Sequence, residues 1–304
     1  MLYFILKKFC ITEISMNKKI LIASDSTTDL GPELIEKYGI KILPLGVTMS
    51  GNEYTDGVDI TPDMIYENYE KTGELPKTSA VNLSTFEDFF EEYTKKGYAI
   101  IIFTISSLMS STYHNACMAA EDFDDVYVVD TKNLSTGGGL MVIRACEMAE
   151  SGMSAPEIVE ACDELAGRID ASFVIDSLEF LHKGGRCSAL AAFGANLLKL
   201  KPCIVVRDGK MGVAKKYRGI FGNILKQYVT DQLGDCSDIE LDHVFVTHAG
   251  CDPEINNAII EQVKAVAPFK NVHFTRAGCT ISSHCGQNCL GVLFIRKNKI
   301  HTEQ

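Results

Sequence analysis

Hydroxyl side chains gather at several points of the chain, each directly after a segment that reads as a buried strand. The densest group follows the uncharged segment 99–105 and consists of Ser106, Ser107, Ser110, Ser111 and Thr112. A helix is predicted to begin just after this group. In open α/β sheets, ligands bind at the carboxyl ends of strands, and a helix start offers free backbone N–H groups. The pattern therefore favours an anionic ligand, with helix capping by the serines as the alternative interpretation.

Two charged or titratable side chains could contribute to such a site. His284 lies within the small polar stretch 278–289, which we expect to be a loop between the last two strands. Arg186 follows Gly184 and Gly185, which would let the backbone approach a ligand closely, and a guanidinium pairs well with carboxylate or phosphate. A structural role for His284 and an ordinary ion pair for Arg186 remain open alternatives.

The cysteines do not form a recognisable metal or disulfide framework. The chain has 11 cysteines, scattered and without a CxxC pair. Cys279, Cys285 and Cys289 lie near His284, but their spacing matches no zinc pattern. We therefore predict reduced cysteines, a cytoplasmic protein, and no metal or other cofactor.

Alternating strands and helices in the first half of the chain predict a mostly parallel sheet. Strands are expected at 19–24, 40–47, 99–105 and 126–130. Ser84 and Glu87 have the spacing of a helix capping box. The segment 131–139, with three glycines, is expected to be a loop before a helix over 140–150.

The pattern changes near Gly167. Segments 202–207 and 210–217 flank Asp208-Gly209 and predict a β-hairpin, which implies a mixed sheet. We expect an N-terminal α/β domain over 19–167 and a C-terminal α/β domain over 168–298. Residues 1–18 would be an N-terminal extension and 299–304 a tail.

The overall composition excludes some classes of function. The chain has 304 residues, 46% hydrophobic and 23% charged, as expected for a globular protein. Its net charge of −11 argues against nucleic-acid binding. No apolar run approaches the roughly 20 residues of a membrane helix.

The motifs, taken together and in this order, resemble the DegV family, which includes the fatty-acid-binding subunits of bacterial fatty acid kinase. The matching segments are SDSTTDL (24–30), TS (78–79), SSLMSSTY (106–113), DTKNLSTGGG (130–139), LEFLHKGGR (178–186), KLKP (199–202) and GCTISSHCG (278–286). The resemblance implies two α/β domains with one long-chain fatty acid bound between them. It also implies a non-catalytic protein that presents the carboxylate to a separate ATP-dependent kinase, which forms an acyl phosphate.

By the same resemblance, Thr78, Ser79, Ser110 and His284 bind the fatty-acid carboxylate. Arg186 and Ser111 are candidates for contact with the ligand or with the kinase catalytic subunit. The stretches TSAVN (78–82) and GQN (286–288) depart from the family pattern. These departures leave the chain length, unsaturation and branching of the acid open.

Two other functions are kept as alternatives. One is an acyl-ester hydrolase with Ser110 as nucleophile and His284 as base, although the chain has no GxSxG motif. The other is a regulatory protein whose lipid is structural. We expect no nucleic-acid partner, and we allow for peripheral or transient contact with a membrane.

Overall fold

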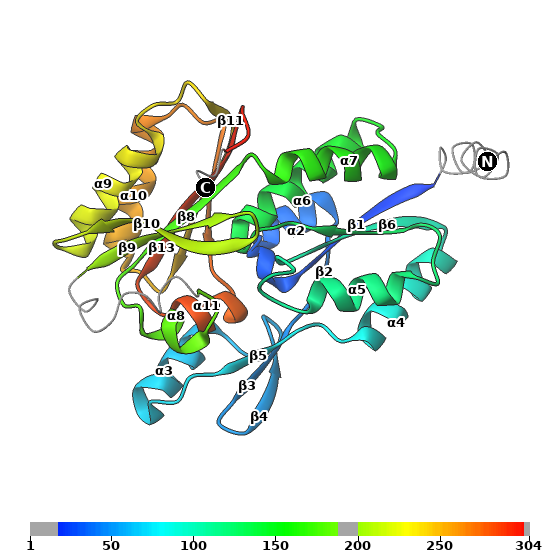
Figure 1. Cartoon of the computed structure of the whole chain (residues 1–304), viewed down its shortest axis with the longest axis horizontal. Coiled ribbons are helices and arrows are strands. Elements are labelled where there is room, and N and C mark those ends of the chain that lie inside the picture. The colour runs from blue at the N-terminus through cyan, green and yellow to red at the C-terminus, as the bar shows by residue number, and fades with distance from the viewer. Residues whose placement is uncertain (1–17, 188–199, 301–304) are drawn as a thin grey trace.

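The computed structural model describes residues 18–187 and 200–300, which form an α/β fold with three sheets (Figure 1). The N-terminal part contains a parallel sheet and the C-terminal part a mixed sheet, which confirms the predicted fold class. The boundary between two domains near residue 168 remains a proposal. The predicted extension and tail lie largely outside the described residues.

The first sheet has the strand order β2-β1-β6-β7, and all of its strand pairs are parallel. Its strands are β1 (Lys19–Asp25), β2 (Lys41–Leu43), β6 (Tyr98–Thr104) and β7 (Val126–Asp130). Helices α4 (Leu83–Lys95) and α5 (Thr112–Ala120) pack on one face. Helices α2 (Pro32–Tyr38), α6 (Ser135–Glu150) and α7 (Ala155–Ala166) cover the other face. Both faces are buried, which explains why β6 is continuously apolar.

The second sheet has the strand order β10-β9-β8-β13-β11-β12. Its strands are β8 (Ile169–Ile175), β9 (Lys201–Arg207), β10 (Lys210–Tyr217), β11 (Ile239–Ala249), β12 (Asn271–Arg276) and β13 (Cys289–Arg296). β9 and β10 form the predicted hairpin, with Asp208 and Gly209 both at positive φ in its turn. Helices α9 (Phe221–Leu233) and α10 (Pro253–Val266) cover one face of this sheet.

Helix α6 lies between the two larger sheets and is buried along most of its length. It begins at Ser135, so the prediction of a loop over 131–139 was wrong for its second half. The glycines of this segment allow close packing: a Cβ at Gly139 would lie 2.9 Å from the backbone oxygen of Thr28. Burial against both sheets outweighs the low helix propensity of glycine.

A small antiparallel sheet, β4-β3-β5, carries part of the site. It consists of β3 (Gly46–Met49), β4 (Asn52–Thr55) and β5 (Lys77–Ser79), with α3 (Pro62–Thr72) between β4 and β5. The single strand predicted over 40–47 was therefore wrong. The chain leaves the parallel sheet after β2 and enters the small sheet as β3. Pro44 lies between them and has no backbone N–H with which to continue the strand pairing.

Two further predictions of local structure need correction. Helix α4 is capped by Asn82, whose side chain accepts a hydrogen bond from the Thr85 N–H at 2.8 Å, and not by Ser84 with Glu87. The polar stretch 278–289 is not a continuous loop, because Cys279–Cys285 forms helix α11. Figure 1 shows α11 beside α8 (Glu179–Gly184), between the six-stranded sheet and the small sheet.

Candidate functional site

His284 lies in the last turn of α11 and forms a hydrogen bond with Thr78 on β5. The distance between Thr78 Oγ1 and His284 Nε2 is 2.9 Å. The other ring nitrogen, Nδ1, is buried and has no hydrogen-bond partner. Burial, with a smaller contribution from the positive charge of Arg186, lowers the pKa of His284 to about 4. The imidazole is therefore neutral at pH 7.

The tautomer of His284 follows from the same contacts. Buried N–H groups without an acceptor are rarer in proteins than buried acceptors without a donor, so we assign the proton of His284 to Nε2. Nε2–H then donates to Thr78 Oγ1, and the hydroxyl hydrogen of Thr78 is free to donate to a ligand. The pair thus presents one oriented O–H donor.

The Gly184-Gly185-Arg186 sequence has a steric role beside this histidine. A Cβ at Gly184 would lie 2.6 Å from His284 Nδ1, so a side chain there would collide with the imidazole. Gly185 ends α8 at a φ of 68°, in the left-handed region that glycine favours. This turn leads to Arg186, which is exposed and lines the same cavity as His284.

The structure brings the six predicted residues Thr78, Ser79, Ser110, Ser111, Arg186 and His284 to one cavity of about 300 Å³. Ser110 and Ser111 lie just before α5, and the Ser110 hydroxyl is 2.9 Å from that of Thr112. Ser79 and Ser111 are exposed, whereas Thr78 and Ser110 are half-buried. Among the described residues that line this cavity there are hydroxyl groups, a histidine and an arginine but no carboxylate. Such a lining suits an anion.

An apolar chamber adjoins this polar cavity. Its volume is about 50 Å³, and its walls come mainly from the face of the six-stranded sheet, α8 and α11. Four residues line both spaces: Leu134, Met211, Ile281 and His284. The polar cavity and the apolar chamber therefore share part of their walls, so hydrogen-bond donors lie beside a space lined by hydrocarbon.

Two carboxylates from the N-terminal part hold the beginning of α11. Asp56 accepts hydrogen bonds from the backbone N–H groups of Cys279 at 2.8 Å and Thr280 at 3.0 Å. Asp29 accepts from the N–H of Gly278 at 2.8 Å. These bonds satisfy donors that a helix leaves unpaired at its first turn. They fix the helix that carries His284 against the part of the chain that carries Thr78.

Asp29 and Asp25 belong to the SDSTTDL motif and are buried. Burial raises the pKa of Asp29 to about 8 and that of Asp25 to about 6, with hydrogen bonds opposing the shift. Asp25 accepts from the backbone N–H of Ile105 at 2.8 Å and so connects the carboxyl ends of β1 and β6. The acidic residues of this motif hold the loops in place and do not line the cavity.

Sequence reasoning missed several residues of the site. Leu134, Met211 and Ile281 had no signal beyond ordinary apolar positions, and Asp56 had none at all because its partners on α11 lie more than 200 positions away. Thr280, which also lines the cavity, follows from His284 by helical spacing once 279–285 is known to be a helix.

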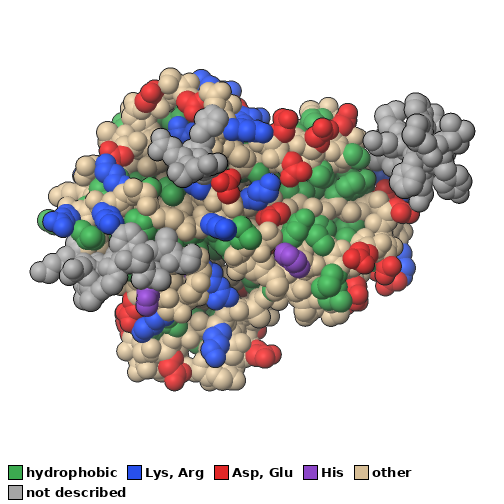
Figure 2. Space-filling view, in the orientation of Figure 1, with side chains coloured by type: hydrophobic (Ala, Val, Ile, Leu, Met, Phe, Trp, Pro, Cys, Tyr) green, Lys and Arg blue, Asp and Glu red, His purple; other side chains and the backbone are tan. Residues whose placement is uncertain are grey.

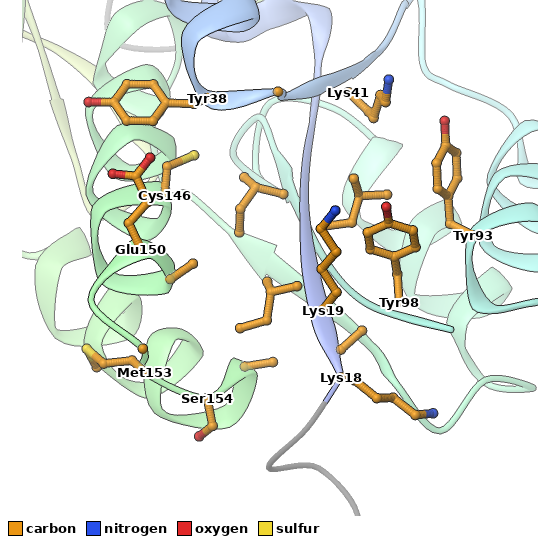
Figure 3. Close-up of a pocket in the computed structure, with 18 of the residues that line it drawn as sticks. Lys18, Lys19, Tyr38, Lys41, Tyr93, Tyr98, Cys146, Glu150, Met153 and Ser154 are labelled. Atoms are coloured by element: carbon orange, nitrogen blue, oxygen red, sulfur yellow. The ribbon is translucent and has the colours of Figure 1, made fainter. Parts of the chain in front are cut away.

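A hollow larger than the His284 cavity lies elsewhere. It has a volume of about 1110 Å³ and lies at the amino ends of β1 and β6 (Figure 3). Two of its lysines have partners: Lys18 pairs with Asp125, and the ammonium of Lys19 lies 5.5 Å from the centre of the Tyr98 ring. Size alone would favour this hollow as a ligand site, but none of the six residues predicted to bind a ligand or partner lines it.

Within residues 18–187 and 200–300, no helix is long and apolar enough to cross a membrane. No cluster of three or more His, Cys, Asp or Glu side chains in these ranges could hold a metal ion. On the face shown in Figure 2, acidic and basic side chains are interspersed with hydrophobic ones.

The hold of Asp56 on α11 can be tested by Asp56→Asn. The carboxylate of Asp56 accepts hydrogen bonds from three donors: the two backbone N–H groups of α11 and Ser26 Oγ at 3.0 Å. The asparagine side chain has only one acceptor oxygen for them. We expect the free energy of unfolding in urea to fall by about 1–3 kcal/mol, because at least one buried donor loses its acceptor. The matched control is Asp63→Asn, which removes an exposed ion pair with Arg276 and should cost less than about 1 kcal/mol. Equal losses in the two variants would contradict the account.

The raised pKa of Asp29 predicts a pH dependence. Between about pH 4 and pH 8 the folded protein holds a proton on Asp29 that the unfolded chain releases, so stability falls as pH rises through this window. Asp29→Asn mimics the neutral acid and removes this dependence. From about pH 5 to about pH 8, the free energy of unfolding of the wild type should fall relative to the variant by at least about 1 kcal/mol. A difference that stays constant across this range would exclude a raised pKa for Asp29.

Comparison with known proteins places this architecture among related chains. The sequence matches the model of the DegV family of uncharacterised proteins over residues 19–297. A DegV domain-containing protein of Clostridium acetobutylicum is 34% identical over 285 residues, covering 92% of this chain and 99% of that protein. A fatty-acid-binding DegV family protein from Thermus thermophilus has a TM-score of 0.85 and 28% identity, covering 91% of this chain and 99% of that one. A stearic-acid-binding protein from Eubacterium ventriosum has a TM-score of 0.79 and 29% identity, covering 92% and 99%. The chain belongs to the DegV family.

Proposed function

We propose that this protein binds one long-chain fatty acid in the site that contains His284. The carboxylate lies in the donor-lined cavity and the acyl tail enters the apolar chamber. The observation that carries this proposal is that the donor-lined cavity and the apolar chamber are adjacent and share four lining residues, Leu134, Met211, Ile281 and His284. The fatty-acid-binding relatives of similar fold support the same ligand class.

The energetics of such a ligand divide between its two ends. Burial of each methylene stabilises the complex by about 0.8 kcal/mol, so the tail supplies most of the affinity. The chamber of about 50 Å³ is smaller than a long tail needs, so side chains must move as the tail enters. Met211 lines both spaces, and its unbranched side chain can adopt several shapes.

The head group is bound by hydrogen-bond donors. Thr78 donates its hydroxyl hydrogen to a carboxylate oxygen while its oxygen accepts from His284. Ser110 and Ser79 supply further hydroxyl donors, and Arg186 supplies a positive charge at the exposed side of the cavity. A neutral imidazole leaves the ionised carboxylate without a nearby proton donor strong enough to protonate it.

We further propose that the bound acid is the substrate of a separate ATP-dependent fatty acid kinase, as the family resemblance implies. In that step a carboxylate oxygen forms a bond to the γ-phosphorus of ATP, the bond to the leaving ADP oxygen breaks, and an acyl phosphate results. This protein would orient the carboxylate and perform no bond chemistry itself. Arg186 and Ser111, both exposed at the cavity, are the proposed contacts for the kinase. The use of ATP agrees with a cytoplasmic location.

The hydrolase alternative has less support from the hydrogen bonds. A serine nucleophile needs a hydrogen bond to its general base. Here His284 is hydrogen-bonded to Thr78, and Ser110 is hydrogen-bonded to Thr112. Binding is therefore the better account of these side chains.

The carboxylate role of Thr78 predicts the behaviour of Thr78→Val. The variant should bind palmitate about tenfold more weakly than the wild type, because it loses a hydrogen bond to a charged group. Thr78→Ser should retain binding within about threefold. The matched control is Thr230→Val, which makes the same change at an exposed position on α9. Isothermal titration with palmitate measures all four proteins, and unchanged affinity of Thr78→Val would refute the role.

The kinase proposal predicts that acyl phosphate forms only when this protein, palmitate, ATP and the kinase catalytic subunit of the same organism are combined. Hydroxylamine converts acyl phosphate to a hydroxamate that can be quantified. Ser110→Ala should lower the rate several-fold because the carboxylate loses an orienting donor. Ser84→Ala, at an exposed position on α4, serves as the control. If the wild type yields no hydroxamate, the lipid serves a regulatory or structural purpose instead.

A further inference from the structure

Thr280 is a buried polar side chain in the cavity wall that the binding scheme above does not use. Its side chain is 4% exposed, and its hydroxyl oxygen has no hydrogen-bond partner. Within the described parts of the chain, the buried side-chain atoms without a partner are Thr104 Oγ1, Asn256 Oδ1, Thr280 Oγ1 and His284 Nδ1. Two of these atoms belong to residues of α11 that line the same cavity.

The position of Thr280 is fixed by its surroundings. Thr280 and His284 are four residues apart on α11, so their side chains lie on one face of the helix. The backbone N–H of Thr280 donates to Asp56 at 3.0 Å, which anchors this residue at the first turn. The hydroxyl is therefore held in the wall of the site before any ligand arrives, as a preorganised group would be.

The chemistry of the cavity indicates what an unpaired hydroxyl there can bind. A threonine hydroxyl can donate one hydrogen bond, and an ionised carboxylate can only accept. The described residues that line the cavity include no aspartate or glutamate that could take this hydrogen. A buried hydroxyl without a partner destabilises the free protein, and an acceptor brought by the ligand would relieve that cost.

We propose that Thr280 is a further carboxylate-binding residue, whose hydroxyl donates a hydrogen bond to the head group of the bound fatty acid. The proposal rests on the function proposed above and adds a hydroxyl donor from α11 to those of Thr78 and Ser110. Asp56 then positions two ligand-binding side chains at once, because it anchors the helix that carries both Thr280 and His284.

The test uses Thr280→Val, which keeps the shape of the side chain and removes the hydroxyl. We expect palmitate to bind the delipidated full-length variant about tenfold more weakly than the wild type in isothermal titration. Unfolding in urea without ligand should show a variant at least as stable as the wild type, because the lost hydroxyl had no partner. Thr280→Ser should bind palmitate within about threefold of the wild type.

Thr104→Val is the matched control, because Thr104 carries the same kind of unpaired buried hydroxyl but does not line the cavity. This control should leave palmitate affinity unchanged. If Thr280→Val binds palmitate like the wild type while Thr78→Val does not, the role of Thr280 is wrong and the proposed function stands. If Thr280→Val also destabilises the free protein, its role is structural and the inference fails. If the wild type itself does not bind palmitate, both proposals fail.

Discussion

The hydrogen bonds between the carboxylates of Asp29 and Asp56 and the first backbone N–H groups of α11 hold the site together. Each carboxylate comes from the N-terminal part of the chain, and each donor comes from the C-terminal part. Both carboxylates are buried, so their bonds to N–H groups are shielded from competing water. Without these bonds, a helix as short as α11 would be unstable, and the imidazole of His284 would lose its alignment with Thr78.

The proposed binding mode separates two tasks. The apolar chamber would provide affinity that grows with the number of buried methylenes, which does not need exact geometry. The polar cavity would orient the carboxylate through Thr78, Ser110 and His284, which depends on atoms held at hydrogen-bond distances. A protein that presents a carboxylate to a partner needs both, because a tightly bound tail alone would leave the head group free to turn.

Much of the fold could be predicted from periodicity, turn residues and burial patterns, as the β9–β10 hairpin and the parallel character of the sheet that contains β1 and β6 show. The six site residues followed from motifs, and the structure places them around one cavity. Two of the failed predictions have a common cause. Helix α11 and the glycine-rich start of α6 contain residues with weak helix propensity, and both become helical through contacts with distant parts of the chain. Helix α11 depends on hydrogen bonds to Asp29 and Asp56. The start of α6 depends on burial between two sheets. Single-sequence patterns carry no information about such partners.

The most direct test of fatty-acid binding is mass spectrometry of an organic extract from the purified full-length protein. The account predicts one fatty acid per protein molecule, and the measurement would also identify its chain length and unsaturation. A Thr78→Val protein purified in parallel should retain less of the same acid. An extract without fatty acid, from a folded protein that also fails to bind added palmitate, would contradict the account.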